Sequence, residues 1–198
     1  HFIGIVRYYC IPSDKSAKFG WYEKGPGINL INAIKESVGN AKIIAEDLGV
    51  VGPDVEELLL ESGYPGMKVL EFAFDGSRDN VYLPHNHVKN SVLYIGTHDN
   101  DTLKGYCDTL SEDSLLFLMN YLDVVGKREI SDAMIRIAYM SVANTVILQM
   151  QDILGKDNSA RMNFPSTIGT NWKWRMKEGE FGKEICKKLR NLTDIYGR

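Results

Sequence analysis

The sequence predicts an α/β fold that forms the C-terminal half of a (β/α)8 barrel. Short apolar runs begin about 25 residues apart, which is the scale of a βα unit. Helical stretches alternate with these runs, and such alternation favours a parallel sheet. Four expected strands with their helices make up about half of the roughly 250 residues of a complete barrel. We therefore expect residues 1–198 to be one portion of such a barrel, whose other half lies upstream.

The first expected strand covers residues 41–51. Its apolar run at residues 43–45 is continuous rather than alternating, which favours a strand that is buried on both faces. A helix should follow from Pro53, because proline suits the first helical position and the acidic residues after it suit the positive end of the helix dipole. Gly63 marks its expected end.

The other expected elements show the same patterns, apolar runs for strands and helical periodicity for helices. They are strands at residues 67–74, 91–95 and 145–150, and helices at residues 111–125, 131–143 and 178–192. Residues 75–90 have no helical period and are expected to form a long loop, and loops of this length are often functional.

Composition and charge exclude several classes of protein. Of the 198 residues, 44% are hydrophobic and 25% are charged, as in ordinary globular proteins. A net charge of −3 argues against general binding to nucleic acid or anionic membranes, since both need a concentrated basic surface. No apolar run approaches the roughly 20 residues that span a bilayer.

The cysteines indicate a reducing compartment, and we expect a cytoplasmic protein. Cys10, Cys107 and Cys186 are widely spaced and form no CxxC pair. An odd and sparse set suits a reducing compartment better than a disulfide framework. Each cysteine is interpreted as a small buried hydrophobic residue.

Acidic residues close two of the expected strands. Glu46 and Asp47 follow the first strand, and the run GTHDNDT at residues 96–102, which contains Asp99, follows the third. In a barrel, carboxylates at the C-terminal ends of strands point into the active-site mouth. Two of them could flank one glycosidic bond, as proton donor and as negative charge. Alternate residues of a strand share a face, so Glu46 lies with Ile44 and only one residue of the acidic pair should be catalytic.

Other interpretations of these residues stay open. An acidic pair before a glycine is also typical of a polar strand end that enters a turn. The second run could be a turn, a sugar site, or a metal site built from His98, Asp99 and Asp101, because hard cations prefer oxygen ligands.

Aromatic and histidine residues elsewhere give a weaker signal. Trp172 and Trp174 could stack on sugar faces, although packing is the commoner role of such a pair. His85 and His87, in the long loop, are expected to be solvated.

Seven sequence motifs are distributed along nearly nine-tenths of the chain. They are HFIGIVRYYCIP at residues 1–12, GPG at 25–27, IIAEDLGVV at 43–51, YPGMKVLEFAFDG at 64–76, YLPHNHVKNSVLYIGTHDNDT at 82–102, LQMQDILG at 148–155 and ARMNFPSTIGTNWKWR at 160–175. In this order they resemble the 4-α-glucanotransferase family, also called amylomaltases or disproportionating enzymes. The combination of IAEDLG with GTHDNDT is the most specific of them.

This resemblance implies an α-amylase-superfamily barrel and a retaining double displacement. Glu46 matches the general acid/base, and Asp99 matches the residue that stabilises the transition state. His1, His98 and Asn163 match positions that contact sugar.

The nucleophile of the family is the aspartate of an Arg-x-Asp-His-Phe motif. The sequence begins at the histidine of that motif, so we expect the nucleophile immediately before His1, outside this chain. Asp47 also matches a family position, which we interpret as structural support. Two positions depart from the pattern: Ile3 stands where many relatives carry arginine, and Ser166 replaces the glycine of the usual Pro-Gly-Thr.

The resemblance also implies the partners. They are α-1,4-glucans, maltooligosaccharides and glucose, with no metal and no cofactor, together with the missing N-terminal half of the same protein. The chain alone is expected to be inactive. Two alternatives remain at this point, a non-catalytic glucan-binding fragment and a metal-dependent hydrolase that uses His98, Asp99 and Asp101.

Overall fold

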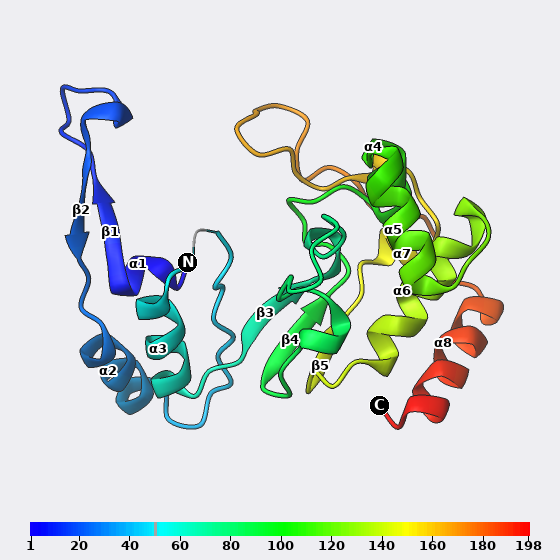
Figure 1. Cartoon of the computed structure of the whole chain (residues 1–198), viewed down its shortest axis with the longest axis horizontal. Coiled ribbons are helices and arrows are strands. Elements are labelled where there is room, and N and C mark those ends of the chain that lie inside the picture. The colour runs from blue at the N-terminus through cyan, green and yellow to red at the C-terminus, as the bar shows by residue number, and fades with distance from the viewer. Residues whose placement is uncertain (50) are drawn as a thin grey trace. The chain divides into compact units, whose positions relative to one another are not determined.

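The computed structural model describes residues 1–49 and 51–198, and they form two compact units (Figure 1). Unit 1 comprises His1–Met67 and unit 2 comprises Lys68–Arg198. We describe each unit by itself. Among the described residues, none of the helices combines the length and the apolar character that crossing a membrane requires.

Unit 1 combines an antiparallel hairpin with helices. In chain order its elements are α1 (Ile3–Val6), β1 (Arg7–Cys10), a 3-10 helix (Ala17–Phe19), β2 (Trp21–Lys24), α2 (Ile28–Val38), α3 (Pro53–Ser62) and the first residues of β3 (Gly66–Val69). Strands β1 and β2 pair from Arg7 opposite Lys24 to Cys10 opposite Trp21. The sequence did not predict this hairpin or α2.

Helix α3 confirms the expected capping signals. Pro53 occupies the start of the helix, and Gly63 ends it in the left-handed conformation with φ of 69°. Its buried residues Val55 and Leu58 pack in a small apolar core together with Ile31 of α2 and Ala45.

The expected strand at residues 41–51 is wrong as a regular strand. Residues 41–48 carry no assigned secondary structure, and Val50, near the end of the expected run, lies outside the described residues. Among its described residues, the segment makes isolated backbone bonds rather than a regular ladder. The Phe2 N–H donates to the Glu46 carbonyl at 2.8 Å, and the Ala45 N–H donates to the Pro65 carbonyl at 2.9 Å.

The expected burial of that segment on both faces is also wrong. Ile44 is 45% exposed, whereas Ala45 is 4% exposed. The alternation continues, with Glu46 partly exposed and Asp47 buried. Ala45 and Asp47 are therefore covered while Ile44 and Glu46 are not, which agrees with the prediction that Ile44 and Glu46 share a face.

Unit 2 contains a small sheet covered by helices (Figure 1). The sheet order is β3, β4 (Ser91–Tyr94) and β5 (Thr145–Ile147), and β4 and β5 are parallel. The helices are α4 (Leu103–Thr109), α5 (Glu112–Leu122), α6 (Lys127–Met140), α7 (Met150–Ile153) and α8 (Lys183–Tyr196). Single 3-10 turns cover Leu70–Phe72, Pro84–Asn86 and Asn158–Ala160.

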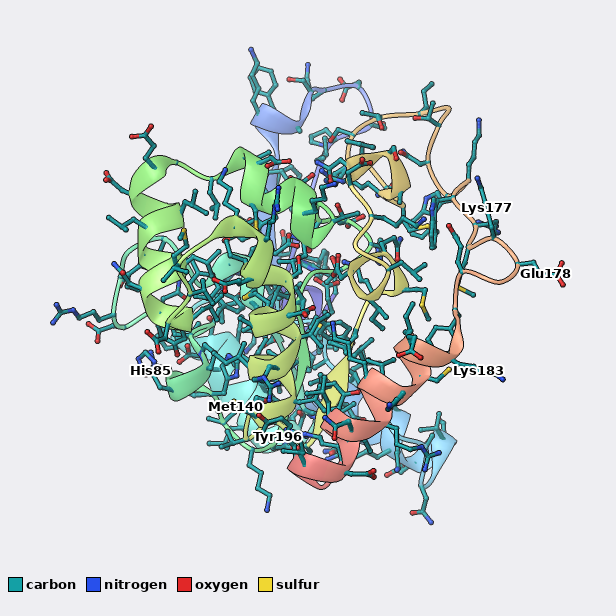
Figure 2. All side chains as sticks on the ribbon, turned by 90° about the vertical axis from the view of Figure 1, so that its right-hand side faces the viewer. His85, Met140, Lys177, Glu178, Lys183 and Tyr196 are labelled. Carbon is teal, nitrogen blue, oxygen red and sulfur yellow. The ribbon has the colours of Figure 1, made fainter. Side chains whose placement is uncertain are left out.

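The core of unit 2 lies between the sheet and its helices. Leu93 and Ile95 from β4 and its end pack with Leu118 of α5 and with Ile130 and Met134 of α6, all at most about 1% exposed. Helix α8 packs beside α6 (Figure 2), and the Arg136 guanidinium on α6 donates to the Tyr196 hydroxyl at 3.2 Å.

Most expected elements of unit 2 are confirmed, with shifted bounds. The strands at 91–95 and 145–150 are β4 and β5, and the helices at 111–125 and 131–143 are α5 and α6. The strand expected at 67–74 ends at Val69, where a 3-10 turn begins.

The C-terminal helix begins later than expected, at Lys183. Gly179 has φ of +81°, a left-handed conformation that interrupts a helix, and Gly182 serves as the N-cap. The short helices α4 and α7 were not predicted.

The burial of individual residues corrects two further expectations. His87 is 9% exposed rather than solvated, and burial lowers its pKa, while His85 is exposed as expected. Cys107 is buried, but Cys10 is only half-buried and Cys186 is exposed, so not every cysteine is a core residue.

Asp47 has the structural role that its match suggested. Its side chain is 8% exposed, and its Oδ1 accepts the Met67 N–H at 2.6 Å. Its Oδ2 lies where a Cβ on Gly66 would come within 2.6 Å, so a side chain at residue 66 would disturb this contact.

We predict that Asp47→Ala, in the full-length protein, lowers the free energy of unfolding by about 1–3 kcal/mol, because a buried N–H loses its acceptor. Asp47→Asn keeps an acceptor oxygen and should cost less. Urea unfolding measures both, with the exposed Asp14→Ala as the control. Equal stability of Asp47→Ala and the parent protein would contradict the structural role.

Candidate active site

The carboxyl end of β4 carries the run that contains Asp99. The Asp99 side chain is 49% exposed, and the Asn163 amide donates to its Oδ1 at 2.6 Å. His98 Nε2 lies 3.4 Å from the same oxygen. The structure thus brings together three of the expected site residues, His98, Asp99 and Asn163.

Hydrogen bonds within the turn hold the Asp99 backbone. Asn100 Oδ1 accepts from the Thr97 N–H at 2.9 Å and from its hydroxyl at 2.8 Å. The Asp99 N–H donates to the Thr97 hydroxyl oxygen at 3.3 Å. A turn stabilised by threonine and asparagine side chains is a common solution where the backbone leaves a strand.

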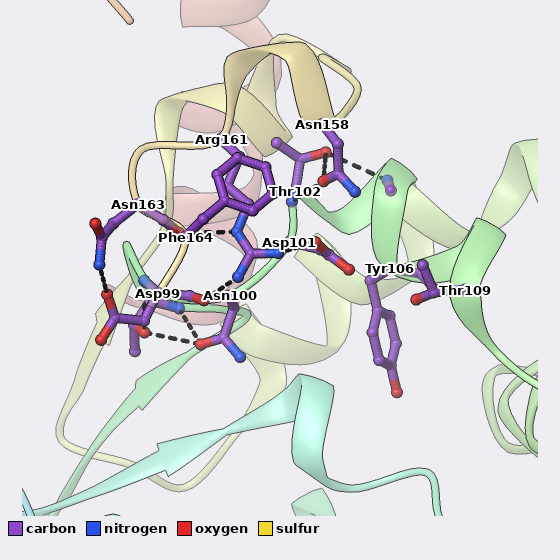
Figure 3. A network of polar contacts seen from close by, with 12 residues as sticks. Asp99, Asn100, Asp101, Thr102, Tyr106, Thr109, Asn158, Arg161, Asn163 and Phe164 are labelled. Atoms are coloured by element: carbon purple, nitrogen blue, oxygen red, sulfur yellow. Dashed lines mark hydrogen bonds and ion pairs between the residues drawn. The ribbon is translucent and has the colours of Figure 1, made fainter. Parts of the chain in front are cut away.

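Arg161 connects this turn to the segment that carries Asn163 (Figure 3). Its guanidinium pairs with the Asp101 carboxylate and donates to the Asp99 carbonyl. Its Nε donates to the Asn163 carbonyl at 2.9 Å. The Asn163 N–H also donates to the His98 carbonyl at 3.0 Å, so the two segments are joined at several points.

The turn then leads into α4, whose first residues are held by distant side chains. Asn158 Oδ1 accepts the Thr102 N–H at 3.0 Å, and Asp152 Oδ1 accepts the Leu103 N–H at 2.7 Å. Thr102 is the N-cap of α4 and accepts from the Gly105 N–H at 3.2 Å.

Trp172 lies beside His98. The two ring centroids are 5.0 Å apart and Trp172 is 52% exposed. An exposed aromatic ring next to a polar cluster presents an apolar face and hydrogen-bonding groups together, which is how pockets combine affinity with orientation.

Unit 1 holds the other expected site residues, Glu46 and His1. His1 Nδ1 lies 3.1 Å from Glu46 Oε1, and both side chains are about half exposed. His1 also lines a groove of about 450 Å3 together with Arg7, Tyr8, Tyr9 and Tyr22. Because Glu46 and Asp99 belong to different units, their convergence on one sugar stays a prediction.

The structure gives no support to the metal site considered from the sequence. Asp101 is turned to Arg161, while Asp99 is turned to Asn163. Within residues 1–49 and 51–198, no three His, Cys, Asp or Glu side chains are arranged to hold a metal ion. The run at residues 97–102 is a turn that presents one carboxylate.

Buried acids lie behind this turn, and sequence reasoning did not identify them. Glu71 is 7% exposed, and burial together with nearby Asp152 and Asp101 raises its pKa to about 9. Burial also raises the pKa of Asp152 to about 6, although its bond from the Leu103 N–H opposes this change. At neutral pH, Glu71 is therefore a neutral carboxylic acid.

Glycine at residue 96 leaves room for two buried polar side chains. A Cβ on Gly96 would lie 2.7 Å from Glu71 Oε1 and 3.1 Å from Gln149 Nε2. These two side-chain atoms, and Asp152 Oδ2, are buried without a hydrogen-bond partner in the described part of the chain. Glu71, Gly96 and Gln149, which follow β3, β4 and β5, thus meet in a cluster of buried polar groups.

Sequence reasoning also did not single out Arg161 or Asn158. Arg161 stands two residues before Asn163 in the stretch that carried the resemblance, and that proximity was the only available signal. Its contacts with Asp99 and Asp101 lie about 60 residues away in sequence, and periodicity gives no information over that separation.

An α/β chain with a polar cluster at the carboxyl end of a parallel strand is typical of barrel enzymes. The family model described as 4-alpha-glucanotransferase matches residues 1–180, and the chain belongs to this family.

Curated relatives match the whole chain. It is 47% identical to the chloroplastic and amyloplastic 4-alpha-glucanotransferase of Arabidopsis thaliana and 44% identical to the 4-alpha-glucanotransferase of Clostridium butyricum. The alignments cover 100% of this chain but only 35% and 41% of those proteins. The chain therefore spans well under half the length of these relatives.

Solved structures agree with this result. An amylomaltase from Streptococcus agalactiae, solved in complex with acarbose, matches with a TM-score of 0.94 and 37% identity, over 100% of this chain and 40% of that one. An amylomaltase from Corynebacterium glutamicum matches with a TM-score of 0.74 at 18% identity, which supports the fold alone. The α/β chain corresponds to part of the barrel of such proteins.

Ser166 adopts a conformation that favours glycine. Its φ is +64°, in the left-handed region, which costs a residue with a Cβ roughly 1–2 kcal/mol. The departure from the usual Pro-Gly-Thr thus places strain in the loop that follows Asn163.

We predict that Ser166→Gly stabilises the full-length protein by about 0.5–1 kcal/mol, because relief of this strain outweighs the greater freedom of glycine in the unfolded chain. Ser131→Gly, within α6, should instead destabilise by about 0.5 kcal/mol. Chemical denaturation measures both, and a destabilising Ser166→Gly would contradict the assignment of strain.

We predict that Glu71→Gln is more stable than the parent protein, and that this difference in the free energy of unfolding grows as pH rises. Below pH 4.5 the carboxyl is protonated in both the folded and the unfolded states, so the variant and the parent protein should be similar. Between pH 4.5 and about 9 only the unfolded parent protein ionises Glu71, which lowers its stability as pH rises, whereas glutamine is unaffected.

Urea unfolding at pH 5, 7 and 9 measures this difference in the full-length protein. The exposed Glu178→Gln is the control and should show no such trend (Figure 2). A stability difference that stays constant with pH would show that Glu71 is ionised in the folded protein.

Proposed function

We propose that this chain is the C-terminal portion of a 4-α-glucanotransferase, which transfers a segment of an α-1,4-glucan to the 4-hydroxyl of an acceptor sugar. Membership of the family is the observation that carries this proposal. The half-exposed Asp99 carboxylate, which the Asn163 amide holds just after β4, also supports the proposal. It places a negative charge where a barrel enzyme binds its substrate.

Glu46 is the proposed general acid/base. In the first step its carboxylic acid donates a proton to the glycosidic oxygen, while an aspartate carboxylate attacks the anomeric carbon and the bond to the leaving sugar breaks. In the second step the Glu46 carboxylate takes the proton of the acceptor 4-hydroxyl, and that oxygen displaces the aspartate. Two displacements retain the anomeric configuration.

We propose that the attacking aspartate immediately precedes His1 in the full-length protein, and that the N-terminal half of the barrel is the obligatory partner of this chain. Retention requires about 5–5.5 Å between the nucleophile and the acid/base. Phe2 donates its N–H to the Glu46 carbonyl at 2.8 Å, so the chain just after the proposed nucleophile lies beside Glu46. This contact supports the proposed placement.

Asp99 is proposed to stabilise the transition state. Its negative charge acts on a sugar ring that becomes cationic, and such a charge contributes most when it is fixed before the reaction. The Asn163 amide fixes one carboxylate oxygen at 2.6 Å, and His98 lies 3.4 Å from that oxygen. His98 and Asn163 are also proposed to contact sugar hydroxyls. His1, which lies beside Glu46, is proposed to do the same.

Transfer rather than hydrolysis requires that a sugar displaces water as the acceptor. The tyrosine-lined groove of unit 1, formed by Tyr8, Tyr9 and Tyr22, offers exposed aromatic faces on which sugar rings can stack. We therefore propose maltooligosaccharides, glucose and larger α-1,4-glucans of starch or glycogen as substrates.

We propose a reducing compartment for this protein, and the cytoplasm is our specific proposal. Its three cysteines are free. The related plant proteins carry chloroplastic/amyloplastic in their names, whereas the name of the Clostridium butyricum relative gives no compartment.

Disproportionation of maltotriose by the full-length protein tests this function. The expected products are glucose and a ladder of longer maltooligosaccharides, resolved by chromatography. The isolated chain of residues 1–198 should give none. Hydrolysis without longer products, or a ladder from the isolated chain, would overturn the proposed activity or the placement of the nucleophile.

We predict that Glu46→Gln and Asp99→Asn each lower kcat for maltotriose by roughly 100-fold or more, because each removes an interaction made in the transition state. Glu36→Gln and Asp108→Asn are exposed controls of the same chemistry and should retain activity. Near-normal turnover in either site variant would remove that residue from its role.

A further inference from the structure

Arg161 makes an unusual set of contacts for a residue close to a proposed active site. Its guanidinium bonds to two main-chain carbonyls, those of Asp99 and Asn163, and pairs with the Asp101 carboxylate (Figure 3). Its flat face lies 4.4 Å from the centre of the Phe164 ring. The side chain is only 15% exposed, so water competes weakly for these bonds.

These contacts join two segments that together hold the Asp99 carboxylate. Asp99 lies in the turn after β4, and its Oδ1 accepts from the Asn163 amide at 2.6 Å. Arg161 holds the main chain of both residues, so it fixes the Asn163 side chain relative to Asp99. The bond from the Asn163 N–H to the His98 carbonyl, at 3.0 Å, also holds these two segments together.

The geometry of the guanidinium is essential to this arrangement. Its donors leave a rigid plane in fixed directions, whereas a lysine ammonium is a point charge on a flexible stem. Lysine at residue 161 could pair with Asp101, but it could not hold the Asp99 and Asn163 carbonyls at the same time.

The charge of Arg161 is directed away from the Asp99 carboxylate. It pairs with Asp101, whose side chain is 19% exposed, and its bond to Asp99 goes to the main-chain carbonyl. The Arg161 guanidinium therefore does not neutralise the Asp99 carboxylate, whose negative charge stays available to the sugar. Arg161 instead influences the orientation of the Asp99 side chain through the main chain.

We propose that Arg161 is a positioning residue that fixes the Asp99 carboxylate against the reacting sugar by tying residues 99, 101 and 163 together. This inference rests on the proposed function of Asp99. It adds a residue that does not itself touch the sugar, and it assigns the Asp101 carboxylate to holding Arg161 rather than to catalysis.

Arg161→Lys in the full-length protein tests the proposal through the kinetics of maltotriose disproportionation. Misplacement of a catalytic group by about 1 Å can cost roughly 100-fold, so we expect kcat to fall about 10- to 100-fold with KM changed less than about 3-fold. Arg190→Lys, on the exposed face of α8, is the matched control and should leave both constants unchanged.

A double-mutant cycle with Asp99→Asn separates positioning from general support of the fold. If Arg161 acts through Asp99, Arg161→Lys should lower kcat by less than about 2-fold in the Asp99→Asn background, because coupled residues are not additive. A residue that only supports the fold would lower kcat by the same factor in both backgrounds, and that result would overturn the proposal.

Chemical rescue gives a second, independent readout. Millimolar guanidinium should raise kcat of Arg161→Ala several-fold, whereas ethylammonium should not, because only a planar fork reproduces the contacts. Equal effects of the two cations would contradict the proposal. If the parent protein does not disproportionate maltotriose, the proposed function itself fails, so the two failures are distinguishable.

Discussion

Side chains of residues 152–161 hold the turn that presents Asp99 and the helix that follows it. Asp152 and Asn158 accept the backbone N–H groups of Leu103 and Thr102, and Arg161 pairs with Asp101. Buried backbone donors must be satisfied, and here acceptors from a later segment satisfy them. Residues 152–161 thus help to hold α4 and the turn before it, together with the Thr97 and Asn100 bonds inside the turn.

A layer of buried acids lies beneath that turn, and its charge is balanced locally. Arg161 offsets Asp101, while burial keeps Glu71 protonated at neutral pH. Three ionised carboxylates behind a single guanidinium would be costly in a medium of low dielectric. Protonation of Glu71 lowers that cost, and the half-exposed Asp99 carboxylate carries a negative charge toward solvent at this end of the sheet.

Local sequence signals predicted elements whose stability is local. Pro53 and Gly63 correctly bound α3, and the apolar runs correctly placed β4 and β5. The apolar run predicts residues 41–48 incorrectly as a regular strand, because among the described residues its neighbours supply isolated backbone bonds rather than a ladder. Local signals also missed the hairpin of unit 1, since exposed tyrosines in short strands give little alternation between buried and polar residues.

By itself, the sequence determined the fold class, the family and the identity of Glu46 and Asp99 as the candidate carboxylates. Each of these rests on short contiguous motifs or on acidic residues that directly follow an apolar run. The tertiary structure alone decided which groups surround them. Asn163 holds Asp99, Asp101 belongs to Arg161, Asp47 supports the main chain, and Glu71 is neutral. These roles depend on contacts across about 20 to 60 residues of sequence and on burial, neither of which a linear pattern specifies.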